Sequence, residues 1–568
     1  MLLLLAIGAF LALGAVWLWR FRRGQPVDID EAGYLSIAIV DYRGLVDGGL
    51  TGYWEAVMAP GIQAPLMTVL TTPVFVLAGT GILPGLLVPL LLGGVMLLAG
   101  YGLGNEVGGP RVAWLTLALI AGAPVVIGYS RSYNFAIASG AATAVMLWAI
   151  ARSRTFDRVG WSVAAGAAVG LVALSRTLTL AFLPAVVLVG LVALAAGPRR
   201  GRRLVGLAVG ALAALVVAGP WYQRNGEAVL DYLTAYGYGR GRIEAGQEQS
   251  VLSLESWRQT VDYVLAYAAL PMVVLWIVGL AVPVGALVVL WRRQGLRTAL
   301  VRAARSPLMP SLVWAGFCMT ALNSTGNKGT GFLTPLVPAL AVLTAWAIWR
   351  LPRPAARSLF VVALTVVALN TVVSLDPRPD WAQQHRVAVP WVHSAPLYLG
   401  RGVIQNYMLQ GAPSAQNGQL THLEGREWHR SMGRLTKDLG ELGPGPAFTA
   451  FGFRHMLVNP NTVQLEQLRG GGPVLSLTMV DSQRVPNDEQ AMTDYLTVGE
   501  AGAACLLLTA RGLTFEIPPI VDALMVERTA RLAGFIRTTT VDLPDGRTVV
   551  VWRRPATCPA VTDTAHDA

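Results

Sequence analysis

Charged residues are scarce in this chain. They make up 14% of its 568 residues, whereas a soluble globular protein carries about a quarter. Hydrophobic residues make up 54%, and the mean hydropathy is +0.51. This balance excludes an ordinary soluble protein. Several apolar runs approach the ~20 residues that a helix needs to cross a bilayer core, so the sequence predicts a polytopic α-helical membrane protein.

Motifs for metal binding are also missing. The sequence has no CxxC, no HExxH and no cluster of His and Cys residues, so a zinc-type site is not expected. Of the three cysteines, Cys318 lies in an apolar run, which favours a position in the core. Cys505 and Cys558 lie in the C-terminal region and can pair only in an oxidising compartment. The sequence leaves their pairing open.

Lysine is nearly absent, since Lys328 and Lys437 are the two lysines among 44 basic residues. The formal net charge is +11. The arginines cluster in short loops between apolar runs, where membrane topology explains them. The positive charge therefore does not indicate a nucleic-acid partner.

The apolar runs define the expected membrane spans. About eleven segments have the length and composition of a span. They are residues 2–19, 84–104, 111–129, 135–151, 159–174, 178–196, 204–222, 263–290, 307–322, 332–349 and 358–375. A further run, 64–79, is short and contains Pro65 and Pro73. It is either another span or a helix lying at the membrane interface.

Arginine-rich loops set the topology. By the positive-inside rule, residues 152–158, 198–203, 292–306 and 350–357 are cytoplasmic. Two expected spans separate each loop from the next, so these loops all fall on one side. Counting back places residues 20–83 outside the cell, provided that 64–79 does not cross. Everything after residue 376 is also expected outside.

Three arginines depart from this rule. Arg20, Arg22 and Arg23 follow the first apolar run, so the topology places them outside. Their position after the run, and the lack of a small-residue cleavage site, argue against a secretory signal. One explanation is that these arginines face an anionic ligand.

The sequence pattern changes after residue 375. Charges, Gly/Pro turns and short β-rich runs appear, and "VDLPDGRTVVVW" (541–552) predicts two strands joined by an Asp-Gly turn. We therefore expect two domains, a transmembrane domain at 1–375 and an extracytoplasmic α/β domain at 376–568.

Polar residues from several loops are expected to meet on the outer face. They are Asp28, Asp30 and Glu31 of the first loop, Arg131, Tyr133 and Asn134 of the second, Arg176 of the third, and Lys328. Acids that deprotonate a nucleophile, together with cations that hold an anionic leaving group, suit a group-transfer reaction. Simpler interpretations remain. Asp28 or Asp30 could cap a helix, and Arg131 and Arg176 could be interfacial anchors.

Several segments resemble the GT-C glycosyltransferases. "DEAGYLSIA" (30–38) is similar to the Asp-Glu-x-x-Tyr signature in the first external loop of these enzymes, and "NKGTGFLTPLVPALAVL" (327–343) resembles their Lys-x-x-Arg-Phe/Tyr-x-x-Pro segment. Residues 64–75, 129–151 and 220–225 resemble further family segments, so the likeness covers about 1–375. The family uses polyprenyl-phosphate sugars and includes protein O-mannosyltransferases and the aminoarabinose transferases of lipid A.

The resemblance implies a fold, a reaction and residue roles. The fold would be GT-C, with an external juxtamembrane helix at 64–79. Asp30 would be the general base for the acceptor hydroxyl, Glu31 would position it, and Lys328 would hold the lipid phosphate with help from Arg131 and Arg176. The other expected substrate contacts are Asp28, Tyr34, Tyr133, Asn134, Asn327 and Phe332. Inversion at the sugar is expected.

The resemblance also implies partners and a location. The partners would be a polyprenyl-phosphate-linked sugar donor, a glycan, lipid or protein acceptor, and the bilayer itself. The protein would be a multi-pass protein of a bacterial plasma membrane, with its active site and C-terminal domain outside.

This sequence departs from the family pattern at several positions. Gly33 stands where a basic residue often follows the acid pair, and Gly331 stands where the Lys-x-x-Arg motif has its arginine. Residues 63–65 read Gln-Ala-Pro instead of Lys-Pro-Pro. The second loop lacks its frequent acidic residue, so no cofactor is expected and a divalent metal is not favoured.

Two other functions fit parts of the sequence. A transporter or flippase of a lipid-linked or anionic substrate would place ionisable residues at mid-membrane and show internal repeats. Here the charges lie at helix ends and no repeat is visible. A noncatalytic scaffold explains the C-terminal domain but not the acid cluster. The glycosyltransferase is therefore the preferred hypothesis.

Overall fold

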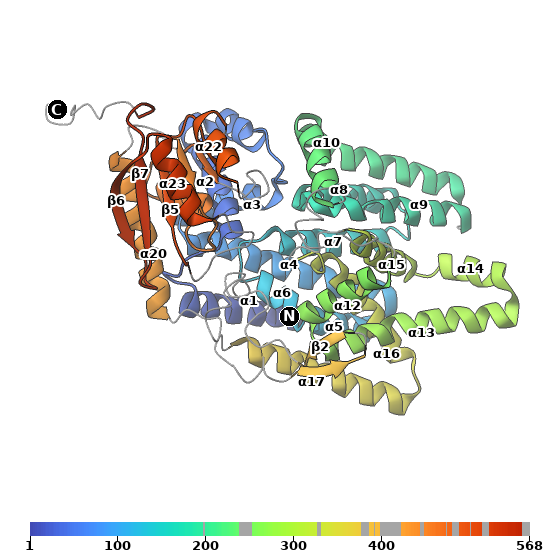
Figure 1. Ribbon diagram of the computed structural model, residues 1–568. Coiled ribbons are helices and arrows are strands. Elements are labelled where there is room, and N and C mark those ends of the chain that lie inside the picture. The colour runs from blue at the N-terminus through green and yellow to red at the C-terminus, as the bar shows by residue number, and fades with distance from the viewer. Residues whose placement is uncertain are drawn as a thin grey trace. The chain divides into compact units, whose positions relative to one another are not determined.

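The fold is described from a computed structural model (Figure 1). It describes residues 1–196, 199–237, 253–325, 331–375, 386–390, 392–397, 422–442, 448–472, 474–479, 488–499, 501–513 and 522–558. By internal contacts the chain forms two compact units. The helical unit comprises Met1–Trp17, Asp47–Pro73 and Leu86–Gln405, and the α/β unit comprises Leu18–Val46, Val74–Gly85 and Asn406–Ala568. The expected boundary after residue 375 stays a prediction.

Apolar helices dominate the first part of the chain. In order they are α1 (Leu2–Phe21), α2 (Ile29–Val57), α3 (Leu66–Ala78), α4 (Ile82–Gly108), α5 (Pro110–Ala121), α6 (Pro124–Tyr129), α7 (Phe135–Arg152), α8 (Val159–Ser175), η1 (Thr177–Phe182), α9 (Pro184–Ala196), α10 (Arg200–Gly237), α12 (Leu254–Ala268), α13 (Leu270–Gln294), α14 (Leu296–Ala304), α15 (Met309–Ser324), η2 (Thr334–Leu336), α16 (Val337–Arg350) and α17 (Arg353–Leu375). A short hairpin of β1 (Arg386–Val389) and β2 (Val392–Pro396) follows.

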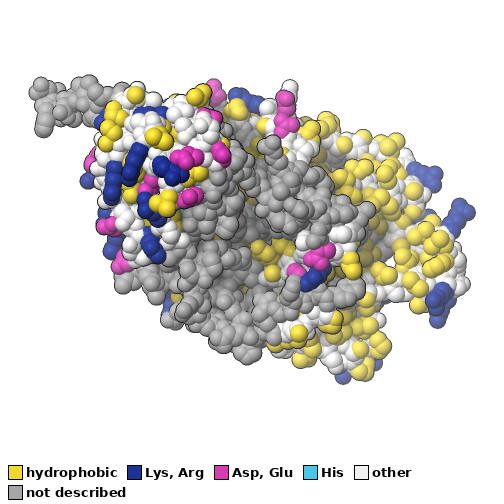
Figure 2. Space-filling model, viewed as in Figure 1, with side chains coloured by type: hydrophobic (Ala, Val, Ile, Leu, Met, Phe, Trp, Pro, Cys, Tyr) yellow, Lys and Arg dark blue, Asp and Glu magenta, His cyan; other side chains and the backbone are white. Residues whose placement is uncertain are grey.

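Seven helices of the described chain are long and apolar enough to cross a membrane, judged by length and composition. Shorter apolar helices accompany them at Leu66–Ala78, Pro110–Ala121, Val159–Ser175 and Thr334–Arg350. Hydrophobic side chains cover the outer faces of α9, α10 and α13 (Figure 2). Basic side chains lie at the first turn of α10 and at the last turn of α13. This distribution confirms the prediction of a polytopic helical membrane protein.

The segment 64–79 forms the short helix α3. Its 13 residues give a length of about 20 Å, which is less than the ~30 Å hydrocarbon core. The length favours the interfacial interpretation over another span.

Two expected spans are broken by proline. Residues 111–129 form α5 and α6 because Pro124 begins α6 and holds Ala123 in an extended conformation. Residues 263–290 form α12 and α13, with a break at Ala269, whose φ is 64°. Pro271 follows in the first turn of α13. The second break leaves the tyrosines of α12 at a helix end.

The α/β unit contains a five-stranded sheet in the order β4-β3-β5-β7-β6. Its strands are β3 (Thr449–Phe451), β4 (Leu477–Met479), β5 (Leu506–Ala510), β6 (Ile536–Asp542) and β7 (Thr548–Arg553). Strands β4, β3 and β5 run parallel to one another, and β7 runs antiparallel to both of its neighbours, β5 and β6. The predicted Asp-Gly hairpin is confirmed, since β6 and β7 pair from Asp542↔Thr548 onward.

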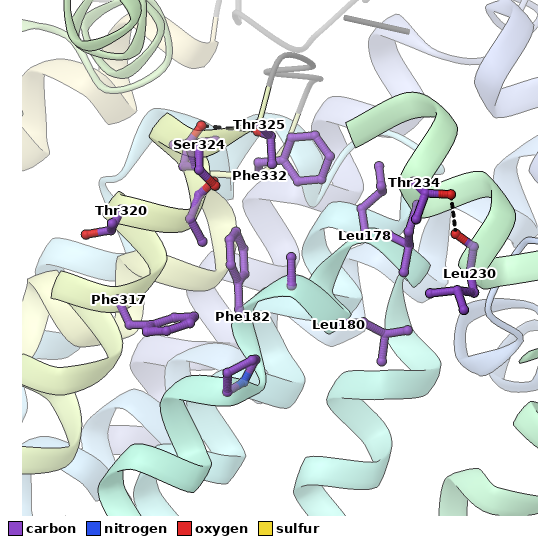
Figure 3. Close-up of a pocket in the computed structure, with 15 residues that line it drawn as sticks. Leu178, Leu180, Phe182, Leu230, Thr234, Phe317, Thr320, Ser324, Thr325 and Phe332 are labelled. Atoms are coloured by element: carbon purple, nitrogen blue, oxygen red, sulfur yellow. Dashed lines mark hydrogen bonds between the residues drawn. The ribbon is translucent and has the colours of Figure 1, made fainter. Parts of the chain in front are cut away.

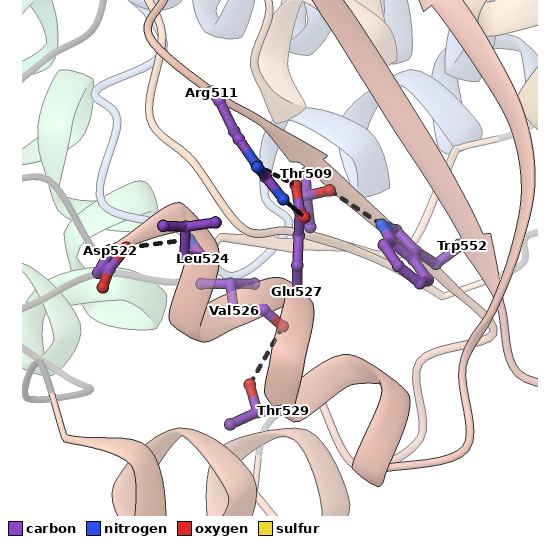
Figure 4. Close-up of polar contacts among 8 residues, drawn as sticks. All are labelled: Thr509, Arg511, Asp522, Leu524, Val526, Glu527, Thr529 and Trp552. Atoms are coloured by element: carbon purple, nitrogen blue, oxygen red, sulfur yellow. Dashed lines mark hydrogen bonds and ion pairs between the residues drawn. The ribbon is translucent and has the colours of Figure 1, made fainter.

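Helices cover both faces of this sheet. Helices α20 (His422–Leu442) and α21 (Pro460–Arg469) contribute to one apolar cluster, and α22 (Glu489–Thr497) and α23 (Ala523–Leu532) contribute to the other. Arg511, just after β5, forms an ion pair with Glu527 of α23, and the Trp552 indole donates to Thr509 Oγ1 at 2.9 Å (Figure 4). Cys505 and Cys558 form a disulfide with their Cα atoms 4.8 Å apart.

Candidate active site

The three acids lie at the start of α2, in the α/β unit. Asp28 is 2% exposed, and its Oδ1 accepts the backbone N–H of Glu31 at 2.8 Å. Asp28 is therefore the cap of α2. Burial raises the pKa of Asp28 well above its usual value, and the neighbouring charges of Glu31 and Asp30 raise it further.

Glu31 is buried and pairs with a cation of the same unit. Its Oε2 lies 2.7 Å from Arg22 Nη2, and the two side chains are 2% and 3% exposed. Arg22 therefore has a carboxylate partner within the protein. Asp30 differs from Asp28 and Glu31 because it is only half-buried, as is Tyr34 one helical turn further on. Solvent thus reaches Asp30 more readily than it reaches the other two acids.

The C-terminal part of the α/β unit holds this helix at two places. At the start of α21, Asn461 Nδ2 donates to the carbonyl of Ile29 at 2.8 Å, directly before Asp30. Asn461 also fills the space above Gly33, where a Cβ would lie 2.9 Å from its Nδ2. At the end of α21, Arg43 donates to the carbonyls of Gly472, at 2.6 Å, and Leu468. These bonds fix the acid-bearing helix against α21.

The main cationic group belongs to the helical unit. Arg176 ends α8 in an extended conformation, and its guanidinium lies 4.3 Å from the centre of the Phe332 ring. Gly331 makes this packing possible because its φ is 85° and a Cβ there would lie 2.3 Å from Ala136 Cβ and 2.9 Å from Arg176 Nη1. The structure therefore brings the predicted residues Arg176 and Phe332 together.

Two tyrosines that the sequence analysis did not identify interact with Arg176. Tyr263 and Tyr267 lie at the end of α12 with their rings 4.7 Å apart, and both interact electrostatically with Arg176. Their i, i+4 spacing before a proline break is the sequence signal that points to a shared helix face.

A large apolar cavity adjoins this group. Its volume is about 540 Å³, and Phe332 contributes to its wall. Phe182 and Phe317 line one side, Leu180 and Leu230 line the other, and hydroxyls of α15 lie near Phe332 (Figure 3). The cavity thus combines an apolar interior with a cation stacked on one of its lining rings.

The remaining predicted residues of the second loop have different surroundings. Tyr133 is fully buried, with its hydroxyl 2.6 Å from Thr71 Oγ1. Asn134 caps α7 by accepting the N–H of Ala136 at 2.9 Å. Arg131 lines a separate cavity of about 200 Å³.

Two predicted residues cannot be placed. Asn327 and Lys328 lie outside the described residues. Across the described part of the chain, His, Cys, Asp and Glu residues form no group of three or more that could hold a metal ion. The acids belong to the α/β unit and Arg131, Arg176 and Phe332 to the helical unit.

Comparison with known proteins identifies the fold. The chain has the GT-C fold of membrane glycosyltransferases, which confirms the resemblance seen in the sequence. A family model described as dolichyl-phosphate-mannose-protein mannosyltransferase matches residues 62–222. A search of curated proteins returns no match.

Three solved structures illustrate the likeness. ArnT from Cupriavidus metallidurans in the apo state is 17% identical with a TM-score of 0.57, covering 96% of this chain and 97% of that one. ArnT bound to undecaprenyl phosphate is 16% identical with a TM-score of 0.55, covering 98% and 99%. The oligosaccharyltransferase AglB from Archaeoglobus fulgidus, with an inhibitory peptide and a dolichol-phosphate, is 12% identical with a TM-score of 0.50, covering 89% and 69%.

Proposed function

We propose that the protein transfers a sugar from a polyprenyl-phosphate donor to an acceptor hydroxyl on the outer face of a bacterial plasma membrane. The observation that carries this proposal is the stacking of Arg176 on Phe332, because Phe332 lines the 540 Å³ cavity. An apolar cavity with a cation beside it suits a ligand that is a long hydrocarbon with a phosphate head. The solved relatives bound to undecaprenyl phosphate and dolichol-phosphate support this choice of ligand.

The reaction is a single displacement. Asp30 takes the proton of the acceptor hydroxyl, whose oxygen forms a bond to the anomeric carbon of the sugar. The bond from that carbon to the phosphate oxygen breaks, and polyprenyl phosphate leaves with the electron pair. Arg176 and Lys328 stabilise the phosphate as its negative charge grows. Attack opposite to the leaving group inverts the anomeric configuration.

The choice of Asp30 follows from the surroundings of the three acids. Asp28 caps the helix and Glu31 pairs with Arg22, and both of these side chains are buried. Asp30 is half-buried and is thus accessible to an acceptor. Glu31, next to it in the same helical turn, positions the base through its fixed ion pair.

The disulfide supports an extracytoplasmic location. Disulfides persist in oxidising compartments outside the cytosol, and the bond between Cys505 and Cys558 lies in the α/β unit. The same unit contains Asp30 and Glu31. An oxidising environment for this unit would therefore also place the acids on the outer face.

The affinity for the donor lipid tests the role proposed for Arg176. Undecaprenyl phosphate is titrated into purified wild type, Arg176→Gln and the control Arg350→Gln. Arg350 is also stacked on an aromatic ring, 5.2 Å from the centre of Trp346, but Trp346 does not line the cavity, whereas Phe332 does. We expect Arg176→Gln to weaken binding by roughly tenfold or more, because a charge-assisted bond contributes about 1.5–3 kcal/mol, and Arg350→Gln to bind normally. Equal affinities for all three would contradict the proposed phosphate site.

A further inference from the structure

A second cavity lies between α1, α6 and α17. Its volume is about 200 Å³, and its wall includes Ala6, Ala9, Phe10 and Leu13 of α1 together with Arg131 and Ser374. It shares no lining residue with the 540 Å³ cavity. The two cavities therefore provide separate surroundings for Arg131 and Arg176.

Arg131 is a buried cation with little compensation. It is 5% exposed, its Nη1 donates to the carbonyl of Ser374 at 2.7 Å, and its guanidinium lies 4.6 Å from the centre of the Trp17 ring. No carboxylate within the described ranges pairs with it. The Ser374 carbonyl lies at the end of α17, where the helix dipole supplies only a partial negative charge. Burial lowers the pKa of Arg131 to about 9.

The N–H donors of Arg131 and the apolar wall along α1 together indicate the kind of ligand that fits this cavity. A guanidinium carries several N–H donors in a planar fork that matches a phosphate, and only one of those on Arg131 has an acceptor in the described chain. The α1 wall extends for about 12 Å from Gly14 to Ala6 and is apolar. Leu13 in this wall is 46% exposed, so the cavity borders an apolar outer surface of the helical unit.

We propose that this cavity binds an anionic phospholipid of the surrounding bilayer. Its phosphate lies on Arg131, and one acyl chain lies along α1. The weak burial of α1 supports this assignment, because only 17% of its apolar stretch is buried. The lipid would fill the gap beside α1 and join this helix to α6 and α17. The site is independent of the proposed donor site.

Lipid retention and lipid stabilisation test the proposal. Wild type, Arg131→Gln, Ala9→Phe and Arg176→Gln are purified, and bound lipids are identified by native mass spectrometry. The melting temperature of each protein is then compared in vesicles of phosphatidylglycerol and of phosphatidylcholine. Ala9→Phe fills the cavity without changing any charge, and Arg176→Gln is the matched loss of a cation outside it.

We expect wild type and Arg176→Gln to retain phosphatidylglycerol and to melt higher in it than in phosphatidylcholine. Arg131→Gln and Ala9→Phe should retain roughly tenfold less and lose the difference between the two lipids. Equal retention by wild type and Arg131→Gln would overturn the proposal. So would loss of polyprenyl phosphate, and not phosphatidylglycerol, from Arg131→Gln, since that places Arg131 in the donor site.

An ion pair between Arg131 and a carboxylate of the protein is the alternative to the lipid. Asp376 lies outside the described residues and follows Ser374 by two positions, so Asp376→Asn is included. The proposal expects this variant to retain phosphatidylglycerol as wild type does. Equal melting losses in Arg131→Gln and Asp376→Asn, with no change in bound lipid, would show that the protein itself neutralises Arg131, and would refute the lipid site.

Discussion

The ion pair between Arg22 and Glu31 gives the sharpest prediction about stability. Its atoms are 2.7 Å apart, and the side chains are 3% and 2% exposed. Glu31→Gln preserves the shape of the side chain but removes the carboxylate that pairs with the buried Arg22 cation. Breaking a buried pair in this way costs about 3–5 kcal/mol. For a unit of this size that corresponds to a melting temperature lower by about 10 °C.

Three variants in a thermal melt of the purified protein check this value. Glu441→Gln is the control because it breaks the exposed pair Lys437–Glu441, whose side chains are 76% and 65% exposed, and it should leave the melting temperature unchanged. The double variant Arg22→Met/Glu31→Met should recover most of the loss, because neither member of the pair remains as a buried charge. A melting temperature for Glu31→Gln within about 2 °C of wild type would refute the reasoning.

Two further predictions concern the α/β unit. His455 is fully buried, and burial lowers its pKa to about 3. Because the unfolded imidazole titrates near 6.5, the unfolded state binds more protons below that pH, and stability falls by up to ~1.4 kcal/mol per pH unit on acidification. The melting temperature of wild type should therefore drop more steeply from pH 6.5 to 5 than that of His455→Gln, and parallel curves would contradict this. Arg43→Ala should reduce the rate of sugar transfer by about tenfold with little change in donor KM, because α2 loses its bonds to the end of α21, and Arg43→Lys should restore part of the rate. An unchanged rate in Arg43→Ala would show that these bonds do not position the acids.

The local features of the fold were predictable from the sequence. The Asp-Gly hairpin between β6 and β7 and the cap formed by Asp28 each depend on residues close in the chain. The breaks at Pro124 and Ala269 interrupted two expected spans because hydropathy does not register where proline stops a helix.

The candidate site was only partly predictable. Arg176 and Phe332 were each predicted as substrate contacts on the outer face, but their stacking on one another was not predicted. Asn461 could not be found in the sequence because its contact with Ile29 joins residues more than 400 positions apart. The separation of Arg131 from Arg176 depends on helix packing, which loop assignments do not contain. The roles of the predicted site residues stay predictions.

Sugar transfer by an Asp30 variant tests the central claim most directly. Purified wild type, Asp30→Asn and Asp47→Asn are incubated with polyprenyl-phosphate sugars and with a cell-envelope extract that supplies the acceptor hydroxyl, and released polyprenyl phosphate is measured by mass spectrometry. Asp47 is the matched control because it is an exposed aspartate on the same helix. We expect wild type and Asp47→Asn to release polyprenyl phosphate, and Asp30→Asn to bind donor but release about a hundredfold less or none. Full activity of Asp30→Asn, or donor that crosses the membrane without cleavage in wild type, would contradict the proposed glycosyltransferase.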